Sequence, residues 1–262
     1  MHTSPLVRSV FLGGFFLLLC AAGCVGGDAP KDPYPTPDAG GGGHAGKAPD
    51  RDAAAPDTTK AGAAASRFPL VAGSTWTYRH VTPDKDPWDE VATLSDITYD
   101  GAPAFVLADQ EDAQGAETRS TLVVQGTGVY RAFREVRVHD ALALQVRYDP
   151  AFLRFDESWD TNGQTETLDD DWVQTCLMTS VASKCAPGAV KTGKTTHVYT
   201  VVDPHAEVSV PAGKYDAIEI ERYNPDERET RRFWFAAGVG KVREQDVESG
   251  ASEELSDYHV AS

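Results

Sequence analysis

The sequence is short of basic residues. Only 24 of its 262 residues are Lys or Arg, against 40 Asp and Glu, so the formal net charge at pH 7 is −16. Nucleic acids and anionic lipid headgroups are bound through basic patches, and this balance argues against both as partners. Hydrophobic residues at 41% and aromatic residues at 9% are sufficient for a folded core.

The apolar run at the N-terminus is too short to cross a membrane. Residues 10–19 (VFLGGFFLLL) follow Arg8, and ten residues is about half of what a spanning helix needs. A basic residue followed by a run of this length is typical of an export signal. The segment ends Ala21-Ala22-Gly23-Cys24, and small residues before a cysteine resemble the lipobox of bacterial lipoproteins.

The lipobox interpretation predicts a signal peptide over residues 1–23 and a diacylglycerol group on the thiol of Cys24. One position departs from the usual pattern, because Ala21 stands where Leu is common. The alternative is ordinary secretion with cleavage near Ala22 or Gly23. Val25, rather than Asp, after the lipidated residue favours the outer over the inner membrane by the sorting rule of enteric bacteria.

Residues 24–66 have the composition of a tether. Ala, Gly, Pro, Asp, Thr and Lys dominate, with four successive glycines at 40–43. Such a segment cannot bury enough apolar surface to offset the entropy lost on ordering. We expect a disordered linker here and one folded domain over residues 67–262.

Cysteine is rare, with four in the chain. Cys20 would leave with the signal peptide and Cys24 would be acylated, which leaves Cys176 and Cys185. In an exported protein such a pair predicts a disulfide. A metal or redox pair is the rival interpretation, but there is no CxxC spacing and no nearby His.

From residue 68 onward the apolar residues do not recur with the period of a helix. They recur at every second position instead. Leu142, Leu144, Val146 and Tyr148 alternate with polar or small residues, which is the pattern of a half-buried strand. The strands expected on these grounds are 74–81, 90–99, 104–109, 117–125, 130–138, 142–148, 165–168, 195–202, 207–210, 215–223, 229–236, 239–247 and 253–260. On the strand at 130–138, Arg131 is expected on the face opposite Ala132 and Val136.

The links between these strands are short turns, so neighbouring strands must be antiparallel. We therefore predict an all-β antiparallel domain of about a dozen short strands in a curled sheet, as a half-barrel, barrel or sandwich. At most, short helices are expected at 149–155 or 172–183. The five tryptophans (76, 88, 159, 172 and 234) are interpreted as core or rim packing.

Three segments of the domain resemble a known group of sequences. They are Phe68–Tyr78 (FPLVAGSTWTY), Val210–Ile218 (VPAGKYDAI) and Phe233–Val242 (FWFAAGVGKV). Together they resemble a group of β-rich bacterial lipoproteins of the myxobacterial, TapB-like sort. The resemblance covers both ends of the domain well and residues 83–191 poorly. It implies a β fold and an export address, and it supplies no catalytic residues.

Two segments match the sequence patterns of ligand-binding motifs. Residues 188–195 (GAVKTGKT) fit the phosphate-binding GxxxxGK[ST] pattern, but no buried strand precedes them and a strand pattern follows, so we expect no nucleotide. Residues 158–169 partly fit a calcium-binding loop, with Asp160, Asn162, Glu166 and Asp169 as a weak candidate set. The alternative is an Asn-Gly hairpin with a solvated acidic flank.

Linear catalytic motifs are also missing. The histidines of the domain (80, 139, 197, 205 and 259) form no HExxH motif, and no GxSxG elbow is present. Catalytic constellations on β folds are spatial, so a hydrolase is not excluded. The sequence favours a non-enzymatic protein with no catalytic residues and no cofactor.

The sequence therefore predicts a lipid-anchored cell-envelope protein, which is a non-catalytic binding or structural module. Its membrane contact would be the N-terminal lipid, and an envelope protein is one conceivable partner. The first alternative is a carrier that holds a lipid or another hydrophobic ligand on the concave face of the curled sheet. The second is a calcium-assisted hydrolase.

Overall fold

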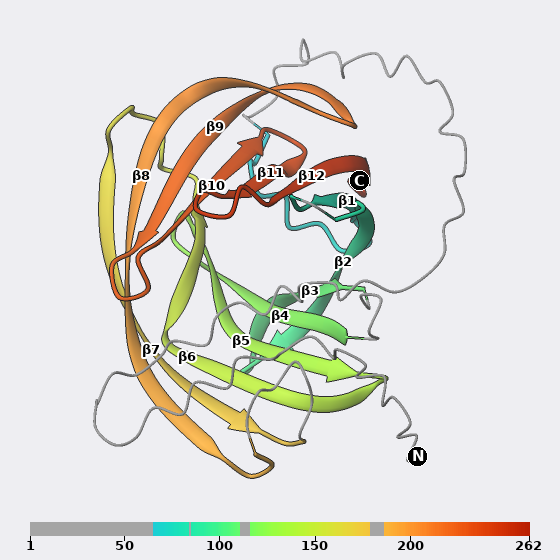
Figure 1. Ribbon diagram of the computed structural model, residues 1–262, viewed down its shortest axis with the longest axis vertical. Helices are drawn as coiled ribbons and strands as arrows, with labels where there is room; N and C mark the ends of the chain where they lie inside the picture. The colour runs from blue at the N-terminus through green and yellow to red at the C-terminus, as the bar shows by residue number, and fades with distance from the viewer. Residues whose placement is uncertain (1–64, 84, 111–115, 179–185) are drawn as a thin grey trace, which may run out of the picture.

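Twelve antiparallel strands form a closed barrel in this computed structural model, which describes residues 65–83, 85–110, 116–178 and 186–262 (Figure 1). Each strand pairs with its neighbours in sequence, and β1 closes the barrel against β12. The fold class predicted from the alternation is confirmed, and of the three expected forms the barrel is the one observed. The strands are β1 (Thr75–Val81), β2 (Trp88–Tyr99), β3 (Ala102–Asp109), β4 (Ala116–Gln125), β5 (Gly128–Val138), β6 (Ala141–Asp156), β7 (Thr165–Cys176), β8 (Val190–Val210), β9 (Gly213–Asn224), β10 (Glu229–Ala236), β11 (Gly240–Asp246) and β12 (Ser252–His259).

This hairpin topology gives the barrel two distinct ends. The start of β1, the end of β12 and the connections β2–β3, β4–β5, β6–β7, β8–β9 and β10–β11 lie at one end, which we call the proximal end. The remaining connections, from β1–β2 through β11–β12, lie at the other, distal end. The chain therefore enters and leaves the barrel at the proximal end.

Of the strands that extend beyond the predicted ranges, β6 and β8 each contain a proline in a bulge. Residues 148–151 of β6, with Pro150 among them, stand opposite the single residue Ala132 of β5. In β8, Pro204 lies within a register shift between Asp203 and Ala206. Proline cannot donate to the ladder, and a bulge removes that requirement.

The short helices expected at 149–155 and 172–183 are not formed in the part of the chain that the structure describes. Residues 149–155 belong to β6, and residues 172–176 belong to β7. The expected strands at 195–202 and 207–210 are one strand, β8, because the bulge at Pro204 lets the ladder continue.

The interior is apolar toward the proximal end. A cluster of buried aromatic and aliphatic side chains fills it, including Phe155, Trp159, Tyr199 and Phe235. Phe68, from the segment before β1, stacks on Phe155 with ring centroids 6.4 Å apart and also contacts Phe235 at 5.9 Å. The residues before β1 thus help to close this end.

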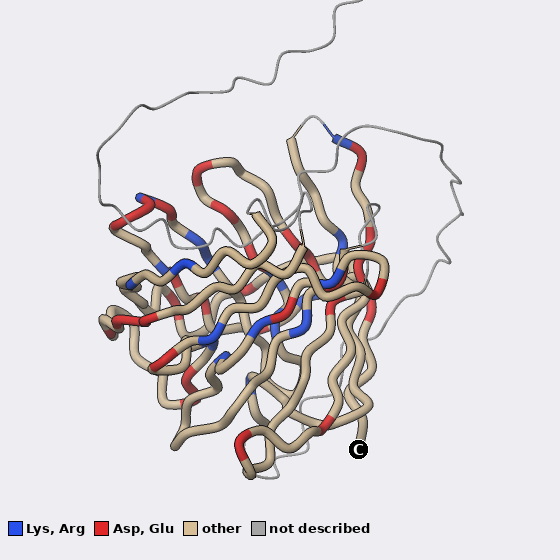
Figure 2. Tube along the Cα trace, turned by 90° about the horizontal axis from the view of Figure 1, so that it is seen from below, with Lys and Arg blue, Asp and Glu red and all other residues tan. Residues whose placement is uncertain are grey.

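Charged residues gather toward the other end of the barrel. In Figure 2, Lys, Arg, Asp and Glu lie mostly in the middle and upper part of the view, whereas the lower part, where the C label marks the end of the chain, is mostly tan. Within the described residues, no helix is long and apolar enough to cross a membrane.

Candidate binding site

Four polar side chains occupy inward-facing positions on β7 to β10. Each stands two residues from a buried apolar residue of its own strand: Asp170 from Trp172, His197 from Tyr199, Arg222 from Ile220 and Arg231 from Phe233. Alternate residues of a strand point to the same face. The four side chains therefore enter the barrel in its distal half.

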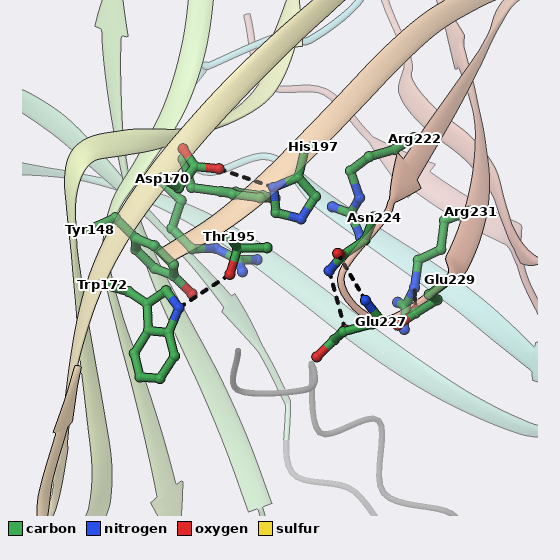
Figure 3. Close-up of a pocket in the computed structure, with 12 residues that line it drawn as sticks. Tyr148, Asp170, Trp172, Thr195, His197, Arg222, Asn224, Glu227, Glu229 and Arg231 are labelled. Atoms are coloured by element: carbon green, nitrogen blue, oxygen red, sulfur yellow. Dashed lines mark hydrogen bonds and ion pairs between the residues drawn. The ribbon is translucent and has the colours of Figure 1, made fainter. Parts of the chain in front are cut away.

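These side chains line a cavity of about 60 Å³. Its volume suits a few water molecules or a small polar group. Figure 3 shows His197, Arg222 and Asn224 pointing toward the same space from β8 and β9. The lining residues are Arg131, Tyr148, Phe152, Asp170, Trp172, Thr195, His197, Arg222, Asn224, Glu227, Glu229 and Arg231.

His197 is held by an acidic partner. Its Nδ1 lies 3.0 Å from Oδ2 of Asp170, and both side chains are buried. The edge of the imidazole meets Phe152, with ring centroids 5.0 Å apart. The carboxylate fixes the orientation of the ring.

Three guanidinium groups surround the ring of Phe152. The Cζ atoms of Arg131, Arg154 and Arg222 lie 5.9, 5.9 and 5.4 Å from its centroid. Arg222 also lies over Phe233, at 5.1 Å. Cation–π contacts favour each pair individually, but three like charges around one ring repel each other.

The carboxylates that line the cavity are already engaged. Asp170 contacts His197, and Glu227 accepts a hydrogen bond from Asn224 Nδ2 at 3.3 Å. Glu229 pairs with Arg231, whose Nη1 also donates to Glu244 at 3.1 Å. Among the described residues, Arg222 has no carboxylate partner within ion-pair distance.

Trp172 forms one wall of the cavity. Its Nε1 donates to Oγ1 of Thr195 at 3.2 Å. The indole lies against Gly193 so closely that a Cβ there would come within 2.2 Å of Trp172. The residues that match the phosphate-loop pattern therefore have structural roles. Residues 190–195 lie inside strand β8, and Lys194 pairs with Asp169 at 3.0 Å.

A second buried polar group lies across the barrel, on β1, β2, β3, β11 and β12. Lys241 Nζ contacts Glu244 at 2.9 Å and Glu253 at 2.8 Å, and it lies over the ring of Tyr78. Burial raises the pKa of Asp109 to about 8, and the neighbouring Glu90 and Glu253 add to this rise. Lys241 joins the two polar groups, because Glu244 also binds Arg231.

His80 belongs to the second group. Its Nε2 lies 3.0 Å from Oε2 of Glu90, and its ring stacks on Trp88 with centroids 4.0 Å apart. Burial alone would lower the pKa of His80, but Glu90 and Glu253 outweigh it and raise the pKa. His80 is therefore a packed histidine, and it is 7% exposed.

The calcium candidates are not brought together. Asp160 and Asn162 lie in the β6–β7 connection, whereas Glu166 and Asp169 lie in β7. Glu166 and Asp169 are three residues apart on one strand and so point to opposite faces. Asp169 binds Lys194 and Thr196 outside the barrel. Within the described parts of the chain, no three His, Cys, Asp or Glu residues are arranged to hold a metal.

The predicted lipidation and disulfide sites are placed only in part. Cys176 is fully buried at the end of β7. Cys185 and Cys24, together with the expected signal peptide and most of the tether, lie outside the described residues. The disulfide and the lipid anchor remain predictions.

The arginines of the cavity were not expected as site residues. Arg131 was expected on the outer face, but a register shift between Arg131 and Phe133 turns Arg131 inward together with Val136, and Arg131 is only 7% exposed. Arg222 and Arg231 could have been predicted as inward-facing, because each lies on the same face of a strongly alternating strand as the buried apolar residues. The other candidate histidines lie elsewhere, as in the exposed pair of His205 with Asp216.

Comparison with known proteins adds little. No protein-family model matches the chain, and no curated protein matches it in sequence. A crystal structure described as that of a "putative lipoprotein" from Parabacteroides distasonis is 10% identical, with a TM-score of 0.30. The match covers 75% of this chain and 99% of that one. A likeness at this level carries no argument, and the resemblance to the TapB-like group stays an expectation.

Proposed function

We propose that this protein is a lipid-anchored, non-catalytic binding module of the bacterial cell envelope, with its ligand site in the distal cavity. The observation that carries the proposal is a closed barrel with a cavity lined by inward-facing polar side chains. Burying charged groups is costly unless they have a role or a partner. The lipobox before Cys24 supports the anchor, in the outer rather than the inner membrane.

The geometry favours a small polar ligand over an acyl chain. A carrier of hydrophobic molecules needs a continuous apolar surface that is left uncovered. Here the apolar half of the interior is filled by the protein's own rings, and Phe155 and Phe235 approach to 4.6 Å between centroids. The cavity of about 60 Å³ is also far smaller than the pockets that take drug-sized ligands.

The cavity supports binding rather than catalysis. His197 with Asp170 resembles the base and orienting acid of a hydrolase, which also requires an activated nucleophile. The three hydroxyls nearest to His197 on its own side of β8 and beside it already have partners: Thr195 accepts from Trp172, Thr196 donates to Asp169, and Tyr199 donates to the Leu153 carbonyl at 2.7 Å. The pair is then an orienting contact for ligand recognition.

Native mass spectrometry on the mature protein, extracted from membranes in a nonionic detergent, tests this proposal. We expect a bound polar molecule of low mass that is lost on denaturation and is retained less by the Trp172→Ala variant. Loss of retention in this variant would place the ligand in the cavity. A co-purifying fatty acid or phospholipid, beyond the covalent anchor, would support the carrier instead and overturn the proposal.

A further inference from the structure

We propose that the distal cavity binds a small oxyanion, such as a carboxylate, phosphate or sulfate group, with Arg222 as its main ligand. This inference rests on the proposed function and specifies the ligand class of the same site. The alternatives for the cavity are a neutral polar ligand or water alone. The way in which the charged lining residues are paired distinguishes these possibilities.

The lining holds three arginines and three carboxylates, but within the described residues no carboxylate lies at ion-pair distance from Arg222. The lining carboxylates at 170, 227 and 229 each have a partner in the protein. Arg131 and Arg154 bring two further guanidinium groups to the Phe152 ring that Arg222 contacts. An anion beside Arg222 would give this guanidinium an acidic partner, because opposite charges a few ångströms apart attract strongly in a buried site.

The lining offers hydrogen-bond donors suited to an oxyanion. A guanidinium presents planar, paired N–H groups that match the oxygens of a carboxylate or phosphate. His197 and Asn224 face the same space as Arg222 (Figure 3), and the amide of Asn224 has a second N–H beside the one that binds Glu227. Arg131 and Arg231 are 7% and 9% exposed, so this charged wall is built into the interior.

The size of the cavity limits the ligand. A volume of about 60 Å³ accommodates an anionic group of a few heavy atoms, either free or as the end of a longer molecule that emerges at the distal end. The chain as a whole is strongly acidic, at −16. Its general field repels anions, so saturable anion binding reports on the cavity rather than on the surface.

Titration calorimetry on the mature, detergent-solubilised protein is the direct test, with sodium phosphate, sodium sulfate and sodium acetate as probes at constant ionic strength. We expect saturable binding of at least one probe. Because charge-assisted hydrogen bonds are the strong ones, we expect Arg222→Gln to weaken binding by about tenfold or more. Arg222→Lys, which keeps the charge but loses the paired donors, should give an intermediate affinity.

Arg147→Gln is the matched control, because Arg147 is a 60%-exposed arginine that pairs with Asp100 outside the barrel. This variant should bind like the wild type.

Melting temperatures of all variants show whether each is folded, and Asn224→Ala tests the cavity independently if Arg222→Gln does not fold. Absence of saturable binding up to tens of millimolar, or equal affinity of the wild type and both cavity variants, would overturn the inference. If native mass spectrometry still shows a neutral ligand lost with Trp172→Ala, the proposed function stands and only the oxyanion is wrong.

Discussion

At the scale of single residues, the packing of Trp172 depends on the lack of a side chain at Gly193. We expect Gly193→Ala to lower the free energy of unfolding by about 1–3 kcal/mol, the range for overpacked cores, because the added Cβ would come within 2.2 Å of the indole. Urea unfolding measures the loss. In a Trp172→Ala background the same change should cost much less, and an equal cost in both backgrounds would contradict this account of Gly193.

Asp109 makes the stability of the barrel depend on pH. Its pKa is raised by burial to about 8, well above that of an unfolded aspartate. Between these two values the folded state holds more protons than the unfolded state, so stability falls as pH rises. We expect the wild-type melting temperature to decrease from pH 5 toward pH 8 and this decrease to be smaller in Asp109→Asn.

The exposed Asp216 provides the control for Asp109. Asp216 pairs with His205 and is 73% exposed, so Asp216→Asn should keep the wild-type pH slope. Glu90 and His80, whose pKa values are also raised, lie in the same environment and keep their own pH dependence in the variant, and the charges of Glu253 and Lys241 lie beside them. A slope identical in Asp109→Asn and wild type would show that Asp109 does not hold the raised pKa.

A residue of the site can be predicted from the sequence only where regular alternation along its strand shows which side chains face inward. His197 and Asp170 alternate with Tyr199 and Trp172, so a period-two pattern places them inward without a structure. Arg131 is different, because the shift at Ala132 reverses the phase and no local signal in the sequence marks it. The pairing of Arg231 with Glu244 could not be predicted either. It depends on the register between β10 and β11, and alternation alone does not determine this register.

At the scale of the elements, proline explains why the predictions for β6 and β8 end early, whereas β7 extends past its predicted end without one. β10, which has no proline, begins and ends at the residues predicted for it. β6 and β8 continue through Pro150 and Pro204 because a bulge takes each proline out of the regular ladder. A sequence shows the proline but not the bulge. The strand predicted for β6 therefore ends at residue 148, and β8 is predicted as two strands.

The segment before β1 stabilises the barrel through Phe68. Its ring contacts Phe155 and Phe235 at the proximal end and is half-buried. We expect Phe68→Ala to lower the free energy of unfolding by about 2 kcal/mol, less than for a fully buried phenylalanine. Val71→Ala, at an exposed position of the same segment, should change it by less than about 0.5 kcal/mol. Similar losses in chemical denaturation would argue against a specific role for Phe68.

At the scale of the whole molecule, the topology separates the attachment of the chain from the candidate site. Residue 65 and the C-terminus lie at the proximal end, whereas the cavity lies in the distal half, near the β9–β10 turn. A lipid on Cys24 would therefore tether the barrel by the end opposite its cavity. This arrangement would leave the cavity accessible to small molecules or partners in the surrounding compartment.

The lipid anchor is the prediction on which this orientation depends. We expect Cys24→Ala to move the protein from the membrane fraction to the soluble fraction of cells, because the thiol that would carry diacylglycerol is gone and the acidic domain has little attraction for anionic lipids. Cys20→Ala, four residues earlier in the signal segment, should leave the protein in the membrane fraction. Immunoblots of fractionated cells, with the mass of the mature N-terminus, measure both variants. Cys24→Ala protein that still sediments with membranes would contradict the anchor.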